Sequence, residues 1–196
     1  GRWTRFRSGP TLAIGAPPAA DLPGAAKELE SLKAIWPETR LLTGEQATAA
    51  SLLQNPRKLR ILHVATHSQF RPDDPLHSSV MLHQSQLSLA DLHRLPLDER
   101  ALVVLSSCQG ALGSAKTGSE PVSLATAVAA AGAQSVIASL WDADDEAAQL
   151  FFGKFYTLLK QGQSVGQSFA GAQQACRAKH PDPSVWANFV LIGNPR

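Results

Sequence analysis

Two long apolar runs rich in β-branched residues constrain the fold of this chain more than any other feature. They are Leu59–His67 and Ala101–Cys108. A strand with one face in water alternates apolar and polar residues, whereas a nearly continuous apolar run of this length is typical of a strand covered on both faces. We therefore predict two neighbouring central strands of a parallel sheet, with helices packed on both sides.

Shorter patterns on either side of these runs predict alternating strands and helices. Helical spacing of apolar residues, proline breaks and cap residues place the elements. The predicted strands are 11–15, 39–42, 135–141 and 186–192, and residues 78–88 form a small connecting hairpin. The predicted helices run from Pro23 to before Pro37, from a Thr43 cap towards Pro56, from a Ser88 cap, and over 121–131, 144–160 and 164–179. This alternation indicates the α/β class.

Composition and charge exclude several classes of function. The chain has 18 basic and 16 acidic residues, which are well mixed, so nothing indicates a nucleic-acid surface. No apolar run approaches the roughly 18 residues that cross a bilayer, and the start lacks a signal peptide and an initiator Met. We expect one domain over residues 1–196, excised from a longer cytoplasmic protein, with no membrane contact.

The cysteines and histidines do not form a recognisable metal site. Cys108 and Cys176 could pair, but they lie in segments of different character, and a reducing compartment fits them better. His77, His83 and His93 have no further ligands at metal-binding spacing. We predict no metal and no cofactor.

His67 and Cys108 each end one of the two apolar runs. Reactive side chains of an open parallel sheet collect beyond the carboxyl ends of its strands. An imidazole beside a thiol can take its proton and leave a nucleophilic thiolate. The small residues in Ser106–Gly110 allow a sharp turn, so that amides, that of Cys108 first, can face an oxyanion. Position alone also allows Cys108 to be a core residue and His67 a strand-end histidine.

Three segments make the sequence recognisable. They read His63-Val-Ala-Thr-His67, Val103-Val-Leu-Ser-Ser-Cys108-Gln-Gly, and AGAQSVIASLWDADD over 131–145. Together they resemble the CHAT family of caspase- and separase-like proteases, and the resemblance runs over nearly the whole chain. It implies a caspase-like three-layer sandwich, with His67 as the catalytic histidine, Cys108 as the nucleophile and His63 as a structural neighbour.

Two segments depart from the pattern of that family. Ser68 stands where the family usually has Gly, and Ser107-Cys108-Gln109-Gly110-Ala111 replaces its Ala-Cys-x-Thr-Gly. The resemblance implies that the backbone amides of Ser68 and Cys108 hold the oxyanion. A Ser at position 68 is more restricted in backbone conformation than a Gly.

Acidic residues follow the strand predicted at 135–141. Asp142, Asp144 and Asp145 cluster there, and Glu120 precedes the helix before that strand. Separases, which cut after arginine, carry a similar Leu-Trp-Asp-x-x-Asp stretch and a similar Glu-Pro. The resemblance thus implies a pocket for a basic P1 residue, made by Asp142 first, with Asp145 and Glu120. Asp144 and Asp145 equally suit the start of a helix, as cap and dipole partners.

The leading hypothesis is a cysteine endopeptidase that cleaves a protein or peptide after Arg or Lys. We expect it in a bacterial protein of signalling or defence, regulated by a helical-repeat domain or another activating partner. The alternative is a catalytically weak caspase-like domain that acts as a protein-interaction module. A small-molecule hydrolase would need a Gly-rich phosphate or cofactor loop, which the sequence lacks.

Overall fold

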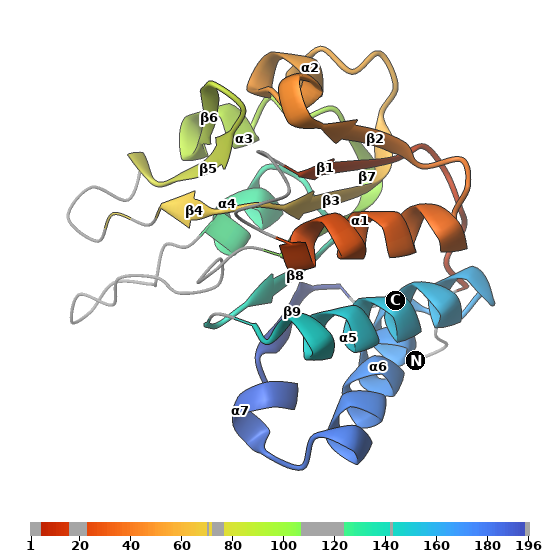
Figure 1. The fold of residues 1–196 in the computed structure, drawn as a ribbon. Coiled ribbons are helices and arrows are strands. Elements are labelled where there is room, and N and C mark those ends of the chain that lie inside the picture. Colours follow the sequence, from red (N-terminus) through yellow and green to blue (C-terminus); the bar gives the residue numbers. More distant parts are fainter. Residues whose placement is uncertain are drawn as a thin grey trace, which may run out of the picture.

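A central sheet organises the chain in the computed structural model, which describes residues 5–15, 23–69, 71, 77–106, 124–141 and 143–194. Within these ranges the sheet has six strands in the order β2-β1-β3-β7-β8-β9 (Figure 1). They are β1 (Thr11–Gly15), β2 (Arg40–Thr43), β3 (Leu59–Ala65), β7 (Leu97–Ser106), β8 (Ser135–Ser139) and β9 (Phe189–Gly193). β9 pairs antiparallel with β8, whereas the other neighbouring pairs are parallel. The predicted mostly parallel sheet is confirmed.

Helices cover both faces of this sheet (Figure 1). One face packs against α1 (Pro23–Ile35), α5 (Asp145–Lys160) and α6 (Val165–Lys179), and the other against α2 (Ala49–Leu53), α3 (Leu89–Leu92) and α4 (Leu124–Ala130). Successive side chains of a strand point to opposite faces. Leu62 and Val64 therefore join one core, while Ile61 and Ala65 join the other. The three-layer α/β architecture predicted from the sequence is confirmed.

The two long apolar runs form the middle of the sheet, as predicted. β3 pairs in parallel with β7, and the register places Ala65 opposite Ser106. Ile61 and Val104 are fully buried. Both strands therefore end at the same edge of the sheet.

The hairpin predicted at 78–88 does more than connect. β5 (Ser79–Leu82) and β6 (Ser85–Ser88) form it, and β5 also pairs antiparallel with β4 (Ser68–Gln69) in a second, three-stranded sheet. Ser88 then caps α3 in a capping box with Asp91, as predicted. Since β4 begins directly after His67, this small sheet borders the carboxyl end of β3.

The predicted cap at Thr43 is wrong. Thr43 ends β2 and makes no side-chain cap bond, and a short 3₁₀ turn follows at Gly44–Gln46. Gly44 adopts a left-handed φ of 56°, which a right-handed α-helix cannot continue. α2 begins only at Ala49, where the Thr48 hydroxyl accepts a hydrogen bond from the Ser51 N–H at 3.1 Å.

The last predicted strand begins too early at Trp186. A short helix, α7 (Pro183–Trp186), precedes it, and β9 starts at Phe189. Asp182 and Pro183 explain this, because Asp is a favourable N-cap and Pro suits the first helical position. The helix predicted over 121–131 is α4, whose residues from Leu124 onward are described, and the positive φ of Gly132 ends it.

Candidate active site

His67 lies just beyond the carboxyl end of β3, with its side chain exposed. The hairpin holds the backbone on both sides of it. The Thr66 hydroxyl donates to the Met81 carbonyl at 2.7 Å, and the Met81 N–H donates to the His67 carbonyl at 2.9 Å. The position of His67 is therefore fixed through its backbone, while its imidazole stays accessible.

Ser68 is half-buried and opens β4, opposite Val80 of β5. The bond between the Met81 N–H and the His67 carbonyl joins the residues that flank this pair. An antiparallel pair flanked in this way is of the non-hydrogen-bonded type, so the Ser68 N–H points away from β5.

Cys108, Glu120 and Asp142 lie outside the described residues. The described part of β7 ends at Ser106, opposite Ala65 of β3. In the sequence, His67 and Cys108 each stand two positions beyond this register pair.

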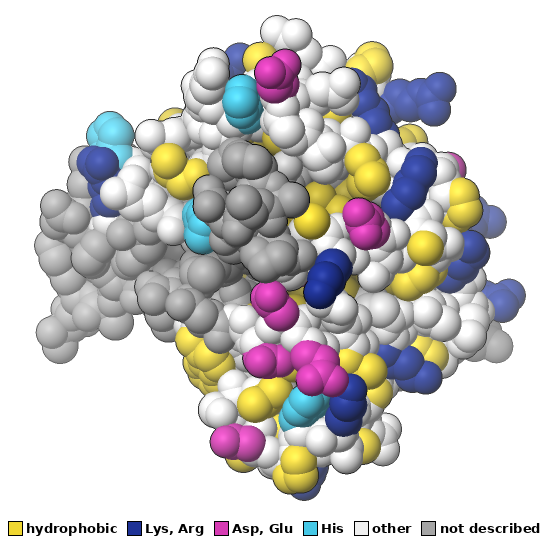
Figure 2. Space-filling model, viewed as in Figure 1, with side chains coloured by type: hydrophobic (Ala, Val, Ile, Leu, Met, Phe, Trp, Pro, Cys, Tyr) yellow, Lys and Arg dark blue, Asp and Glu magenta, His cyan; other side chains and the backbone are white. Residues whose placement is uncertain are grey.

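Asp144 and Asp145 open α5, and acidic side chains gather near this end of the helix on the face in Figure 2. Asp144 is the N-cap, and its carboxylate accepts a hydrogen bond from the Ala147 N–H at 3.0 Å. Asp145 is exposed, and its carboxylate lies against Gly24 near the start of α1 so closely that a Cβ at Gly24 would overlap with it. This contact stabilises α1, since a carboxylate near a helix N-terminus interacts favourably with the helix dipole. The P1-pocket role of Asp145 remains a prediction.

Asn188 is a residue of this region that the sequence did not single out. Its side chain is buried, and Oδ1 accepts hydrogen bonds from the N–H groups of Leu140 and Trp141, both at 3.0 Å. These two residues follow β8 and directly precede Asp142. Asn188 thus holds the backbone that leads into the predicted pocket. Its place before the last strand gives no sequence signal for this role.

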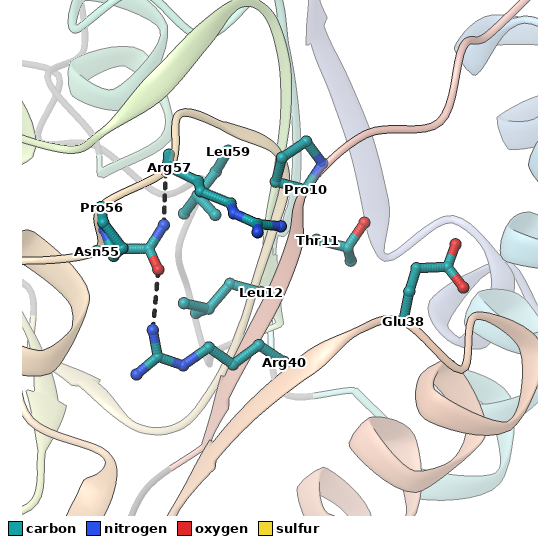
Figure 3. Close-up of a pocket in the computed structure, with 9 residues that line it drawn as sticks. All are labelled: Pro10, Thr11, Leu12, Glu38, Arg40, Asn55, Pro56, Arg57 and Leu59. Carbon is teal, nitrogen blue, oxygen red and sulfur yellow. Dashed lines mark hydrogen bonds between the residues drawn. The ribbon is translucent and has the colours of Figure 1, made fainter.

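A cavity of about 260 Å³ lies elsewhere (Figure 3). It is lined by Pro10, Thr11, Leu12, Glu38, Arg40, Asn55, Pro56, Arg57 and Leu59. The Arg40 guanidinium donates to Asn55 at 3.1 Å, and the Asn55 amide donates to the Arg57 carbonyl at 2.6 Å. The residues come from the amino ends of β1, β2 and β3, and His67 lies beyond the carboxyl end of β3. The cavity is therefore at the opposite end of the sheet from His67.

Neither a metal cluster nor a membrane span is found in the described parts of the chain. Among these residues no three or more His, Cys, Asp and Glu side chains come together in a group that could hold an ion. None of the helices described is both long and apolar enough to cross a membrane.

The CHAT domain model matches residues 4–194. The chain belongs to the CHAT domain family. Among curated proteins, this CHAT domain is similar to tetratricopeptide repeat protein 28 of Mus musculus, with 36% identity over 143 residues. It is 34% identical to the Homo sapiens protein over the same length. The match covers 71% of this chain but only 6% and 5% of those proteins. Both relatives are animal proteins, and the bacterial origin expected from the sequence stays a prediction.

Solved structures share the fold of this CHAT domain. A chain of the Saccharomyces cerevisiae separase–securin complex matches with a TM-score of 0.68 and 16% identity, covering 98% of this chain and 12% of that one. Gingipain R, an Arg-specific cysteine proteinase, matches with a TM-score of 0.63 and 11% identity, over 94% of this chain and 46% of that one. At such low identities the likeness shows the fold alone. That fold is the one caspase-like cysteine peptidases use, as the sequence predicted.

Proposed function

We propose that this CHAT domain is a cysteine endopeptidase with His67 and Cys108 as its catalytic dyad. The register between β3 and β7 carries the proposal, because both residues stand two positions beyond the paired residues Ala65 and Ser106. Residues at equal offsets past neighbouring parallel strands share one edge of the sheet. The family and the caspase-like fold support the same assignment.

The chemistry proceeds in two halves. His67 takes the proton of the Cys108 thiol, and the thiolate sulfur attacks the scissile carbonyl carbon, whose oxygen becomes an oxyanion. As this intermediate collapses, the C–N bond breaks and His67 gives its proton to the leaving amine. A water molecule then loses a proton to His67 and attacks the thioester, which releases the carboxylic acid and restores the thiol.

The backbone amides of Ser68 and Cys108 are the proposed oxyanion donors. Such donors stabilise the negative charge that develops on the carbonyl oxygen. The direction of the Ser68 N–H, away from β5, supports its part in this role.

A basic P1 residue is the proposed specificity. Asp142, Asp145 and Glu120 are the pocket residues that the family resemblance implies, and a carboxylate can bind a guanidinium through two parallel hydrogen bonds. The fold is shared with gingipain R, which is described as Arg-specific. Asn188 would position the pocket by holding Leu140 and Trp141.

Regulation by another segment or partner is part of the proposal. The curated relatives are named as tetratricopeptide repeat proteins, and this chain matches a small fraction of their length. One structural neighbour is a separase bound to securin. A helical-repeat segment or an inhibitory partner is thus the kind of regulator we expect.

Labelling with a peptide that ends in an arginine chloromethyl ketone tests the proposal. We expect the label on Cys108, detected by peptide mass mapping, and no label in Cys108→Ala. Cys176 is an internal control, because it is 1% exposed and burial raises the pKa of its thiol to about 11. If Cys108 is not labelled under any activating condition, with or without a repeat-containing partner, the endopeptidase proposal fails.

The alternative function is a protein-interaction module with weak or no catalysis. Ser68 favours it, since the family pattern has Gly at this position and Ser68 is engaged in β4. A Ser68→Gly substitution separates the two functions. If Ser68 limits catalysis, the glycine variant hydrolyses an Arg-containing peptide faster than the wild type does.

A further inference from the structure

A chain of polar side chains crosses the buried interface between the central sheet and two helices. His63 of β3 is fully buried, and its Nδ1 lies 2.7 Å from the Tyr156 hydroxyl of α5. Its Nε2 lies 2.7 Å from Oε1 of Glu28 on α1. Glu28 is 4% exposed, and its Oε2 accepts a hydrogen bond from the Ser106 hydroxyl at 2.9 Å. Ser106 is the last residue of β7.

The proton positions in this network follow from the partners. A carboxylate can only accept, so the tautomer of His63 that fits its partners carries a hydrogen on Nε2, on the side of Glu28. Tyr156 then donates its hydroxyl proton to Nδ1. Burial, together with the charge of Glu28, raises the pKa of Tyr156 well above its ordinary value, which keeps the hydroxyl protonated. The Nε2–H does not point straight at Oε1, so this part of the network is a close electrostatic contact.

Such a network is costly to bury and specific in its geometry. A buried carboxylate or imidazole destabilises the fold unless it is paired, whereas apolar side chains could fill the same volume. The Phe152 ring packs edge-on against His63, with 5.3 Å between the ring centroids. Its two hydrogen bonds and the His63–Glu28 contact join β3, β7, α1 and α5, and so restrain the relative positions of these elements. The element fixed at its outer end is the terminus of β7.

We propose that Glu28 is a positioning residue for the candidate nucleophile and acts through Ser106. The inference rests on the proposed function, since Cys108 stands two positions after Ser106 in the sequence. Glu28 is itself held by His63 and α1, so it gives the Ser106 side chain a fixed hydrogen-bond partner. It thereby fixes the Ser106 side chain at the end of β7, two positions before Cys108 in the sequence.

The test compares Ser106→Ala with the wild-type chain in two assays. The first is the pH dependence of Cys108 alkylation by iodoacetamide, followed by mass mapping. The second is hydrolysis of an Arg-containing peptide. We expect Ser106→Ala to move the midpoint of the alkylation profile upward, toward the value of about 8.5 for a free thiol. We also expect kcat to fall by about 10- to 100-fold with KM changed less than about threefold.

Two further variants separate positioning from a merely structural role. Ser106→Thr keeps the hydroxyl and is expected to keep the wild-type midpoint. Ser135→Ala is the matched control, because the Ser135 hydroxyl also donates to a single oxygen acceptor, the Asn194 carbonyl at 2.6 Å, but at the start of β8. This control is expected to change stability only. In Glu28→Gln the side chain can still accept a hydrogen bond from Ser106. Its alkylation midpoint and its kcat are therefore expected to lie between those of the wild type and Ser106→Ala.

The two assays also keep this inference distinct from the proposed function. Alkylation reports the Cys108 thiol whether or not the chain cleaves peptides. If the wild type is alkylated with a lowered midpoint but cleaves no peptide, the endopeptidase proposal fails and the positioning role is still measured. If folded Ser106→Ala keeps the wild-type midpoint and kcat, or if Ser106→Thr shifts them as much as Ser106→Ala does, the positioning role is refuted.

Discussion

His67 owes its position to contacts of its neighbours. Thr66 and Met81 hold the backbone around it, while the imidazole remains exposed. His63, four residues earlier, is the reverse case, with a ring that contacts Glu28 and Tyr156 and is closed to solvent. A group that must take up and return a proton needs access to substrate and water. The histidine within β3 and the histidine just beyond its end therefore suit different tasks.

A substitution that removes only the charge of Asp145 tests whether this residue binds the P1 side chain. In Asp145→Asn the side chain keeps its size near Gly24 but loses its charge. If Asp145 binds the P1 guanidinium, kcat/KM for an Arg peptide falls by about 10- to 100-fold while that for a neutral peptide is unchanged. The two kcat/KM values are measured side by side with matched peptides.

Asp144→Ala is the control for that substitution. Asp144 caps α5 through the Ala147 N–H, so its loss should lower the free energy of unfolding by about 1 kcal/mol and leave the Arg preference intact. An unchanged preference in Asp145→Asn would leave Asp145 with only its contact to the start of α1.

The hairpin is the element that links the small sheet to the candidate site. It joins β4 through β5 and contacts Thr66 and His67, which directly follow the end of β3. Its sequence shows the alternation of a hairpin, but β4 has only two residues, too few to give any periodic signal. The cap at Thr48 and the short α7 were missed for a different reason. In both segments several residues that can cap a helix stand close together.

Removal of the Thr66 hydroxyl tests the hairpin contact. Thr66→Val keeps the shape of this buried side chain but removes the hydroxyl that donates a hydrogen bond to the Met81 carbonyl. We expect a loss of about 1–3 kcal/mol in the free energy of unfolding and a several-fold fall in kcat on an Arg peptide. Denaturant unfolding and steady-state kinetics measure the two effects.

Ser85→Ala provides the comparison within the same hairpin. The Ser85 hydroxyl bonds the His83 carbonyl and accepts from the Ala49 N–H, far along the hairpin from Thr66. Ser85→Ala should therefore lower the free energy of unfolding without lowering kcat. Equal losses of kcat in both variants would mean that the hairpin acts only through overall stability.

The whole molecule should lose stability at alkaline pH through two buried groups. Burial raises the pKa of Cys176 from its ordinary 9.0 to about 11, and that of Tyr156 also rises well above its ordinary 10.0. Between these ordinary and raised values the unfolded chain has released protons that the native chain keeps, so stability falls as pH rises. One such group contributes about 1.4 kcal/mol per pH unit.

Cys176→Ala isolates the contribution of the thiol. Denaturant unfolding of both proteins from pH 8 to about 11 should show a shallower decline in the variant, because only Tyr156 of this pair still titrates in the unfolded state. Parallel declines would mean that the Cys176 thiol ionises as easily in the native chain as in the unfolded one.

Much of the architecture could be predicted from local patterns. The central strands, the helices on both faces and the edge at which His67 lies follow from apolar runs, helical spacing and caps. Glu28 and Asn188 could not be predicted, because each acts on a partner that no periodicity connects to it. Glu28 is 78 residues from Ser106, and Asn188 is 47 residues from Trp141. Only the packed sheet brings these pairs together.

The same separations have a consequence for how the chain folds as it is synthesised. The polar network joins residues 78 and 93 positions apart, and its Tyr156 lies on a helix that follows β8. Contacts between distant segments form slowly, since the loops between them must close first. The network at the end of β7 is therefore complete only after α5 has left the ribosome and docked. A nascent chain that has just released residue 108 lacks this support, so any thiol reactivity that depends on it is delayed until most of the domain has been made.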